Sequence, residues 1–139
     1  MSKYLKDDCL FCKIIRREIP SDIVYEDEFV LAIRDINPLA EQHFLVLPKY
    51  HIENYYDDLL LHDNTDDFLK DVLANVHLAI AKIIKQEKLS QYGVRVVQNN
   101  GIEIGQSVFH IHWHIIAGAS ADRNLMEYFT DFYQSKERP

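Results

Sequence analysis

The stretch FHIHWHIIAG, residues 109–118, decides how this chain is organised. Its three histidines, His110, His112 and His114, alternate with isoleucine and tryptophan. Because successive side chains of a β-strand point to opposite faces, the pattern predicts a strand with three imidazoles on one face and apolar groups on the other. Three imidazoles buried in apolar surroundings would be costly, so we expect the histidine face to be open to a ligand.

Hydrophobic patterns outside this stretch predict the other elements of an α+β fold. Apolar residues recur every three or four positions over residues 66–88, which predicts one long amphipathic helix. The expected elements in chain order are a short N-terminal helix over 10–20 ended by Pro20, two strands within 23–38, a buried strand over 43–49, the long helix over 66–88, a strand over 93–99 and the histidine strand. This order predicts a single domain with a mostly antiparallel sheet.

The last 21 residues form a separate part of the predicted organisation. We expect a domain over residues 1–118 and a C-terminal extension over 119–139. Met126, Phe129 and Tyr133 recur at helical spacing, so the extension is expected to be a helix packed on the domain.

Composition narrows the class of protein. The chain has 139 residues, 47% of them hydrophobic, and a formal net charge of -7. An acidic chain is a poor partner for bulk nucleic acid, because such binding depends on Lys and Arg neutralising phosphates. No apolar run is long enough for a membrane span, and MSKYLKDD lacks the apolar core of a signal peptide. We therefore expect no membrane or nucleic-acid partner and a cytoplasmic location.

Two kinds of chemistry suit a row of imidazoles. A metal site is one, but His110 and His114 would lie roughly 13 Å apart along a strand, too far for one ion with bonds of about 2 Å. A phosphate site is the other, since imidazole is a good nucleophile and leaving group at phosphorus. The preceding GIEIGQS, residues 101–107, favours phosphate, because a glycine loop can aim backbone N–H groups at an anion.

Three stretches together resemble one known family. NNGIEIGQSVFHIHWHIIAG (99–118) is similar to the signature of the histidine-triad (HIT) family of nucleotide hydrolases and transferases. Residues 9–38 resemble the N-terminal part of that family, and HFLVLPKYHI (43–52) resembles its middle strand. The adenosine-phosphoramidase (Hint-like) branch is the most similar, and the resemblance does not extend past residue 118.

The resemblance implies a role for each motif residue. His112 would attack the α-phosphorus of a purine nucleotide and form a nucleotidyl-histidine, from which water releases a nucleoside monophosphate. His114 would contact phosphate oxygens, and His110 would orient His112 or serve a neighbouring role. Asn99 and Ser107 complete the implied catalytic set.

The implied nucleotide-binding residues lie in the two other stretches and in the loop. His43 would stand beside the triad, and Asp35 would accept hydrogen bonds from the ribose hydroxyls, which suits a carboxylate. Asp35 and Asn99 could equally be a turn residue and a loop hydrogen bond. Gly105 and Gln106 would contact phosphate and leaving group. The residues implied to line the base pocket, for which plain core packing is an equal alternative, are Leu10, Phe11, Ile14, Ile33, Ile36 and Leu45.

The pair Cys9 and Cys12 admits two interpretations. A C-x-x-C without a second pair needs two more ligands to hold zinc. The resemblance supplies them as His51 and His110, which would complete a closed structural site. The alternative is two free, packed cysteines.

The sequence therefore predicts a HIT-type nucleotide phosphoramidase or hydrolase that cleaves a phosphoramidate or phosphoanhydride. The expected cofactor is a structural zinc ion, with no catalytic metal required, and the resemblance implies a homodimer. The alternatives are a dinucleoside-polyphosphate hydrolase and a non-catalytic nucleotide- or zinc-binding module. Intact His112, Asn99 and Ser107 argue against the last.

Overall fold

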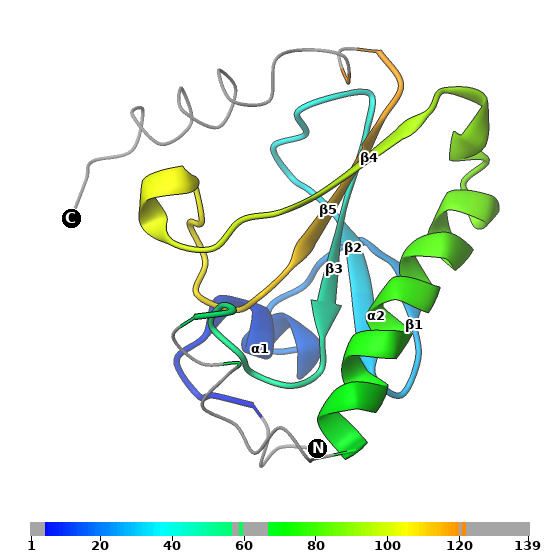
Figure 1. Ribbon diagram of the computed structural model, residues 1–139. Coiled ribbons are helices and arrows are strands. Elements are labelled where there is room, and N and C mark those ends of the chain that lie inside the picture. The colour runs from blue at the N-terminus through cyan, green and yellow to red at the C-terminus, as the bar shows by residue number, and fades with distance from the viewer. Residues whose placement is uncertain (1–4, 57–58, 60–66, 120, 122–139) are drawn as a thin grey trace.

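A computed structural model describes residues 5–56, 59, 67–119 and 121 as one five-stranded antiparallel sheet with helices (Figure 1). The strands lie in the order β1-β2-β3-β5-β4, and every neighbouring pair is antiparallel. The elements are α1 (Leu10–Ile15), β1 (Ile23–Glu26), β2 (Val30–Arg34), β3 (Gln42–Pro48), α2 (Asp67–Gln86), the short 3-10 helix η3 (Leu89–Gln91), β4 (Val94–Gln98), the 3-10 helix η4 (Ile102–Ile104) and β5 (Trp113–Ala117). The predicted α+β class and antiparallel sheet are confirmed.

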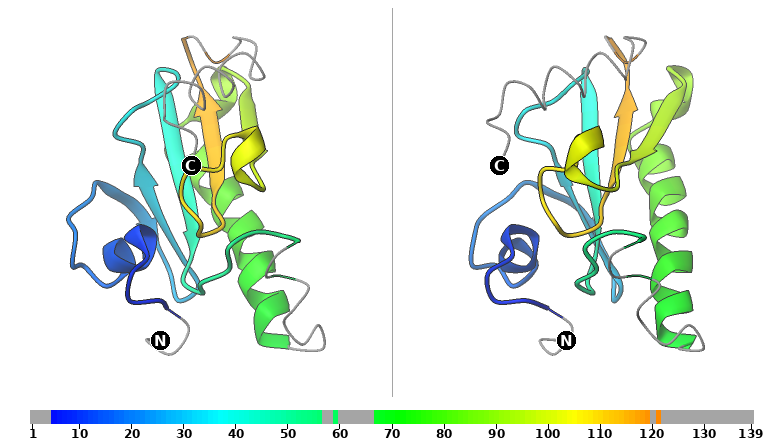
Figure 2. Two further views of the ribbon diagram at one scale, coloured as in Figure 1. Left: turned by 90° about the vertical axis from the view of Figure 1, so that its left-hand side faces the viewer. Right: turned by 60° about the vertical axis from the view of Figure 1, so that its left-hand side comes forward.

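The two helices cover opposite faces of the sheet, as the views along its edge show (Figure 2). Helix α2 packs on the main core, where Val76, Ala79 and Ile83 meet odd-numbered β5 residues such as Trp113 and Ile115. Helix α1 packs on the other face in a smaller cluster with residues of β2 and β3. Because side chains alternate along each strand, one set of strands serves both faces.

Helix α1 ends earlier than the sequence predicted. It stops at Ile15 and not near Pro20. Arg17 adopts a left-handed backbone with φ 66°, while the Arg17 N–H donates to Ile14 O and the Glu18 N–H donates to Lys13 O. This pair of bonds is the Schellman ending, which satisfies the last carbonyls of a helix without glycine or proline.

The histidine stretch is only partly a strand, whereas the sequence predicted a strand through all three histidines. The β5 ladder begins at Trp113, so His110 and His112 precede it. Here the Ile111 N–H donates to Ile52 O, in the segment after β3, at 2.6 Å. The predicted alternation nevertheless holds, because Ile111 lies in the α2 core and the three imidazoles lie on the α1 side.

The strands expected within 23–38, over 43–49 and over 93–99 are present as β1, β2, β3 and β4, and the long helix is present as α2. Residues 122–139, on which the predicted C-terminal helix falls, lie outside the described residues, and the division at residue 118 stays a prediction. Among the helices of the described part, none has the length and apolarity that a bilayer crossing requires.

Candidate active site and metal cluster

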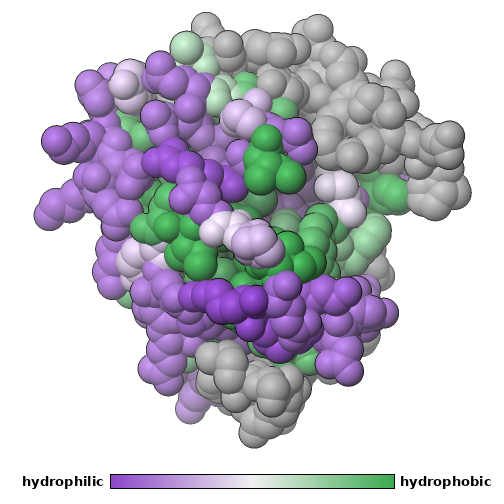
Figure 3. All heavy atoms as spheres, turned by 180° about the vertical axis from the view of Figure 1, so that it is seen from behind, coloured by the Kyte–Doolittle hydropathy of each residue, from purple (hydrophilic) through white to green (hydrophobic). Residues whose placement is uncertain are grey.

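A pocket of about 340 Å³ opens on the α1 side of the sheet, within the range of roughly 300–1,000 Å³ typical of small-molecule sites. From this side, hydrophobic side chains gather mid-surface between hydrophilic ones (Figure 3). All six residues expected to line the base pocket do line it, together with Asp35, His43, Gly105, Ser107, His112 and His114. Of the residues expected to act in catalysis or nucleotide binding, Asn99, Gln106 and His110 are not part of its wall.

The histidine face is buried from bulk solvent but opens to the pocket, which His112 and His114 line, as the sequence predicted. His110, His112 and His114 are 0%, 6% and 8% exposed. Burial is possible because the ring nitrogens have hydrogen-bond partners within the fold, so the desolvation cost is offset.

A backbone N–H sets the tautomers of His43 and His114. The Leu39 N–H donates to His43 Nδ1 at 3.0 Å, so this nitrogen carries no proton. The His43 proton therefore sits on Nε2, which donates to His114 Nδ1 at 2.8 Å. His114 is then protonated on Nε2, and it enters the site as a donor.

His112 has the opposite tautomer. Its Nδ1 lies 2.7 Å from His110 O and must donate to that carbonyl, which leaves a lone pair on Nε2. Burial lowers the pKa of His112 to about 4 and also lowers the pKa values of His43 and His114. The imidazoles are therefore neutral near pH 7, and His112 has the protonation state of a nucleophile.

Asp35 lies at the end of β2, where its carboxylate reaches the pocket. Asp35 Oδ1 accepts from the Asn37 N–H at 2.8 Å, and Oδ2 lies 3.4 Å from His43 Nε2. The turn interpretation and the binding interpretation are thus compatible, since one oxygen caps the turn while the other faces the histidines.

The loop before β5 is shaped by two glycines with positive φ, Gly101 at 100° and Gly105 at 113°. Such angles strain any residue with a Cβ. Gly105 and Ser107 line the pocket. Asn99 is not part of the pocket wall, and its buried Nδ2 is unpaired among the described residues. An unpaired buried amide is costly, so it marks a place for a ligand or water.

Gln106 lies under the loop, where its side-chain amide makes hydrogen bonds within the fold. It is 1% exposed, and its Oε1 accepts from the Gly101 N–H at 2.7 Å. Its Nε2 donates to Glu53 O at 2.6 Å and to Val108 O at 3.2 Å. The amide joins this loop to the segment after β3 by hydrogen bonds. An isolated Gln in a loop gives no sequence signal for this structural role.

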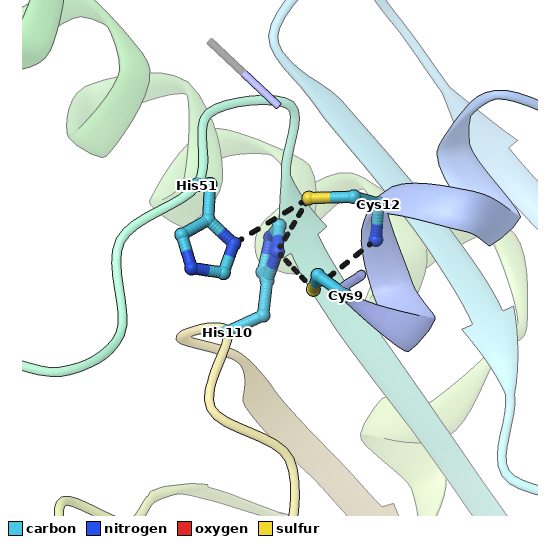
Figure 4. Close-up of side chains that lie close together, drawn as sticks. All are labelled: Cys9, Cys12, His51 and His110. Atoms are coloured by element: carbon cyan, nitrogen blue, oxygen red, sulfur yellow. Dashed lines mark hydrogen bonds between the residues drawn. The ribbon is translucent and has the colours of Figure 1, made fainter. Parts of the chain in front are cut away.

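A second cluster lies beside the pocket and contains the four residues expected to bind zinc (Figure 4). Cys9 is the N-cap of α1 and Cys12 lies in its first turn, so both sulfurs point the same way. His110 Nδ1 lies 3.5 Å from each sulfur, and His51 Nδ1 lies 3.4 Å from Cys12 Sγ. The structure brings the predicted set together from three distant parts of the chain.

The cluster fits a tetrahedral metal ion. With bonds of about 2.0–2.3 Å, the ligand atoms of a zinc ion lie roughly 3.3–3.8 Å apart, which matches the nitrogen–sulfur distances. His110 Nε2 donates to Pro48 O at 2.9 Å, which leaves Nδ1 as the lone pair that a metal needs. The Cys12 thiol lowers the pKa of Cys9 by hydrogen bonding to its sulfur, so one thiolate is already favoured.

A second group with metal-ligand residue types, Asp35, His43 and His114, does not fit as well. The His43 and His114 nitrogens that face each other are joined by a hydrogen bond, and the Leu39 N–H occupies the other His43 nitrogen. His43 therefore offers no lone pair to an ion.

Comparisons with known proteins identify the family of this chain. The HIT domain family model matches residues 16–121. The purine nucleoside phosphoramidase of Escherichia coli K12 is 40% identical over 114 residues, which cover 82% of this chain and 90% of that protein. A 14 kDa zinc-binding protein of Zea mays is 42% identical over 109 residues, which cover 78% and 80%. The structure of a HIT family hydrolase from Clostridium thermocellum has a TM-score of 0.73 at 39% identity and covers 86% of this chain and 96% of its own.

The chain belongs to the HIT family, as its resemblance predicted, and it is an enzyme of that family's hydrolase type. Sequence reasoning missed several contributors to the pocket, among them Pro20, Asn37 and Val108. These residues come from turns whose course only the fold defines, so periodicity could not have identified them.

Proposed function

We propose that this enzyme cleaves a phosphoramidate or phosphoanhydride bond at the α-phosphorus of a purine nucleotide and releases a nucleoside monophosphate. The observation that carries the proposal is the unprotonated Nε2 of His112 on the wall of a pocket that also holds Asp35 and His114. The phosphoramidase from Escherichia coli supports a purine nucleotide as substrate.

The proposed chemistry has two steps at His112. The Nε2 lone pair bonds to phosphorus while the bond to the leaving amine or phosphate breaks, and a leaving amine takes up a proton from solvent. Water then attacks the phosphorus and gives up a proton to solvent, while the N–P bond breaks and its electron pair returns to Nε2. The His110 carbonyl accepts from Nδ1 throughout, so it orients the ring and stabilises the positive charge of the nucleotidylated imidazole.

The neighbouring groups supply donors for the phosphate oxygens. His114 carries its proton on Nε2, because His43 donates to its Nδ1. Ser107 and Gly105 line the pocket from the loop, and the buried Asn99 Nδ2 is a further donor without a partner among the described residues. Such donors can replace a catalytic metal as charge stabilisers, so the proposed mechanism requires none.

The rest of the pocket fits a nucleoside. Asp35 keeps one oxygen toward the pocket, where it can accept from ribose hydroxyls. Apolar side chains of α1, β2 and β3 give the base an apolar surface, and Ile36, which is 87% exposed, offers its side chain at the rim. A bound base would cover the Ile36 side chain, so its exposure without a ligand is consistent with a role in binding the base.

We further propose that Cys9, Cys12, His51 and His110 bind a structural zinc ion, which would tie α1 to β3 and to the histidine segment. The donor set and its spacing support this, and so does the zinc-binding relative from Zea mays. Two free buried cysteines also fit a reducing compartment, in line with a cytoplasmic location.

A homodimer is proposed from the family resemblance. The edge strand β4 leaves Val96 at 46% exposed, and Tyr92 beside it is 50% exposed. Apolar side chains on an unpaired sheet edge favour association with a second chain. Light scattering coupled to size-exclusion chromatography would give twice the chain mass if this is correct.

Hydrolysis of adenosine 5′-phosphoramidate tests the proposed activity. We expect AMP release by the wild type and none above background by His112→Ala, with His77→Ala, a histidine of α2, as an active control. Trapping on denaturation should yield an adenylylated wild-type chain. Folded wild type that binds AMP but cleaves neither the phosphoramidate nor a dinucleoside polyphosphate would show a binding module instead.

A further inference from the structure

His110 is shared by the metal cluster and the active site through two different groups. Its ring turns Nδ1 toward Cys9 and Cys12, and its Nε2 is held by Pro48 O. Its carbonyl oxygen accepts the hydrogen bond that orients His112. One residue therefore contacts the cluster through its side chain and the nucleophile through its main chain.

Phe11 forms a second connection, since it lies between the two cysteines on α1. Its ring contacts His110 edge-on at a centroid distance of 5.9 Å and His112 at 5.0 Å. Phe11 also lines the pocket together with Leu10 and Ile14 of the same helix. A helix of only 6 residues is not stable alone, so its position depends on its attachments, and the cluster provides two of them.

The segment after β3 forms a third connection. It contains His51, whose Nδ1 lies 3.4 Å from Cys12 Sγ. The next residues brace the site through their carbonyls, because Ile52 O accepts from the Ile111 N–H and Glu53 O accepts from Gln106 Nε2. The cluster is thus joined to the nucleophile, to one pocket wall and to the phosphate loop.

We propose that metal binding at the cluster is thermodynamically linked to nucleotide binding in the pocket, with His110 as the connection. The ring of His110 takes part in the cluster and its carbonyl orients His112, so the metal-bound and nucleotide-bound arrangements favour each other. This inference rests on the proposed function. Linkage is reciprocal, so each ligand raises the affinity for the other by the same factor.

The first test compares metal-free and zinc-loaded full-length protein, both shown to be folded by circular dichroism. Calorimetry should give an AMP affinity that is higher in the zinc-loaded form, on the order of tenfold. Competition with a chromophoric chelator should show zinc affinity rising by the same factor when AMP is saturating. Equal AMP affinity in both folded forms would overturn the linkage and leave the proposed function standing.

A pair of histidine variants locates the effect. His51→Ala removes a cluster ligand that is outside the pocket wall, so zinc should no longer raise its AMP affinity. His77→Ala, changed on the other face of the sheet, should keep the wild-type linkage. A His51→Ala variant with the full zinc effect on AMP binding would contradict the proposed route.

A second measurement compares the metal-loaded protein with and without AMP. Cobalt(II) bound at the cluster absorbs visible light in bands that depend on the geometry of its ligands. AMP should shift these bands in the cobalt-loaded wild type, and an unchanged spectrum at saturating AMP would overturn the inference. Failure of AMP to bind in any metal state would instead overturn the proposed function, and the linkage with it.

Discussion

The two faces of the sheet use the same strands for different purposes. On the α2 face, buried residues such as Phe44, Val46 and Ile115 pack against apolar helix residues. On the α1 face, the neighbouring positions hold His43 and His114, and α1 brings two cysteines. Stability and chemistry are thus separated by the alternation of single residues, and changes on the two faces should have different consequences.

The largest expected effect is on the α1 face at His112. His112→Ala removes the proposed nucleophile, so kcat/KM should fall at least about 10³-fold, while the urea midpoint changes little. Steady-state hydrolysis of adenosine 5′-phosphoramidate measures this. His77→Ala is the matched control, because His77 contacts Trp113 from the α2 side, and it should keep nearly full activity.

On the α2 face, a substitution should lower stability more than it lowers activity. Ile83→Ala empties space in the main core, where Ile83 is 0% exposed, and should lower the free energy of unfolding by about 2–5 kcal/mol. Activity per folded molecule should remain. Leu78→Ala, on the same helix but 55% exposed, should change stability by less than about 0.5 kcal/mol. A selective loss of kcat in Ile83→Ala would break the separation of the faces.

A variant of Gln106 tests whether its side-chain amide holds the loop before β5 in place. Gln106→Glu keeps the size and the acceptor for the Gly101 N–H but loses both donations to carbonyls. We expect kcat/KM to fall roughly 10- to 100-fold, because a misplaced loop aligns the phosphate poorly. Gln91→Glu, at an exposed glutamine, should behave as wild type. Equal kinetics in the two variants would show that loop position does not depend on this amide.

The last prediction is a pH dependence of stability. Burial lowers the pKa values of His43, His112 and His114 below the ordinary 6.5, so the unfolded chain binds more protons below that pH. Stability should be full above pH 6.5 and decline as the pH falls, by up to about 1.4 kcal/mol per pH unit for each group. Urea unfolding between pH 8 and pH 5 measures the slope.

His114→Asn should make that slope shallower, since one of the three groups is gone. His77→Asn, at an exposed position, should retain the wild-type slope. A slope that is the same in all three proteins would mean that these buried imidazoles do not control the pH dependence.

The sequence alone predicted the α+β class, the long helix and the identity of the family. These follow from patterns that are local in the chain: alternation fixes the two faces of a strand, and steps of three and four fix a helix face. It also predicted the ligand set of Cys9, Cys12, His51 and His110, through the family resemblance and not through spacing.

Only the tertiary structure decided what each histidine does. The tautomers of His43 and His112 are set by Leu39 N–H and by His110 O, and backbone groups of this kind leave no trace in residue type. The structural role of Gln106 was also hidden from the sequence, because its partner Glu53 O is a main-chain atom that only folding brings close. A sequence specifies side chains in order along the chain, whereas a hydrogen bond depends on which backbone atoms lie within reach once the chain has folded.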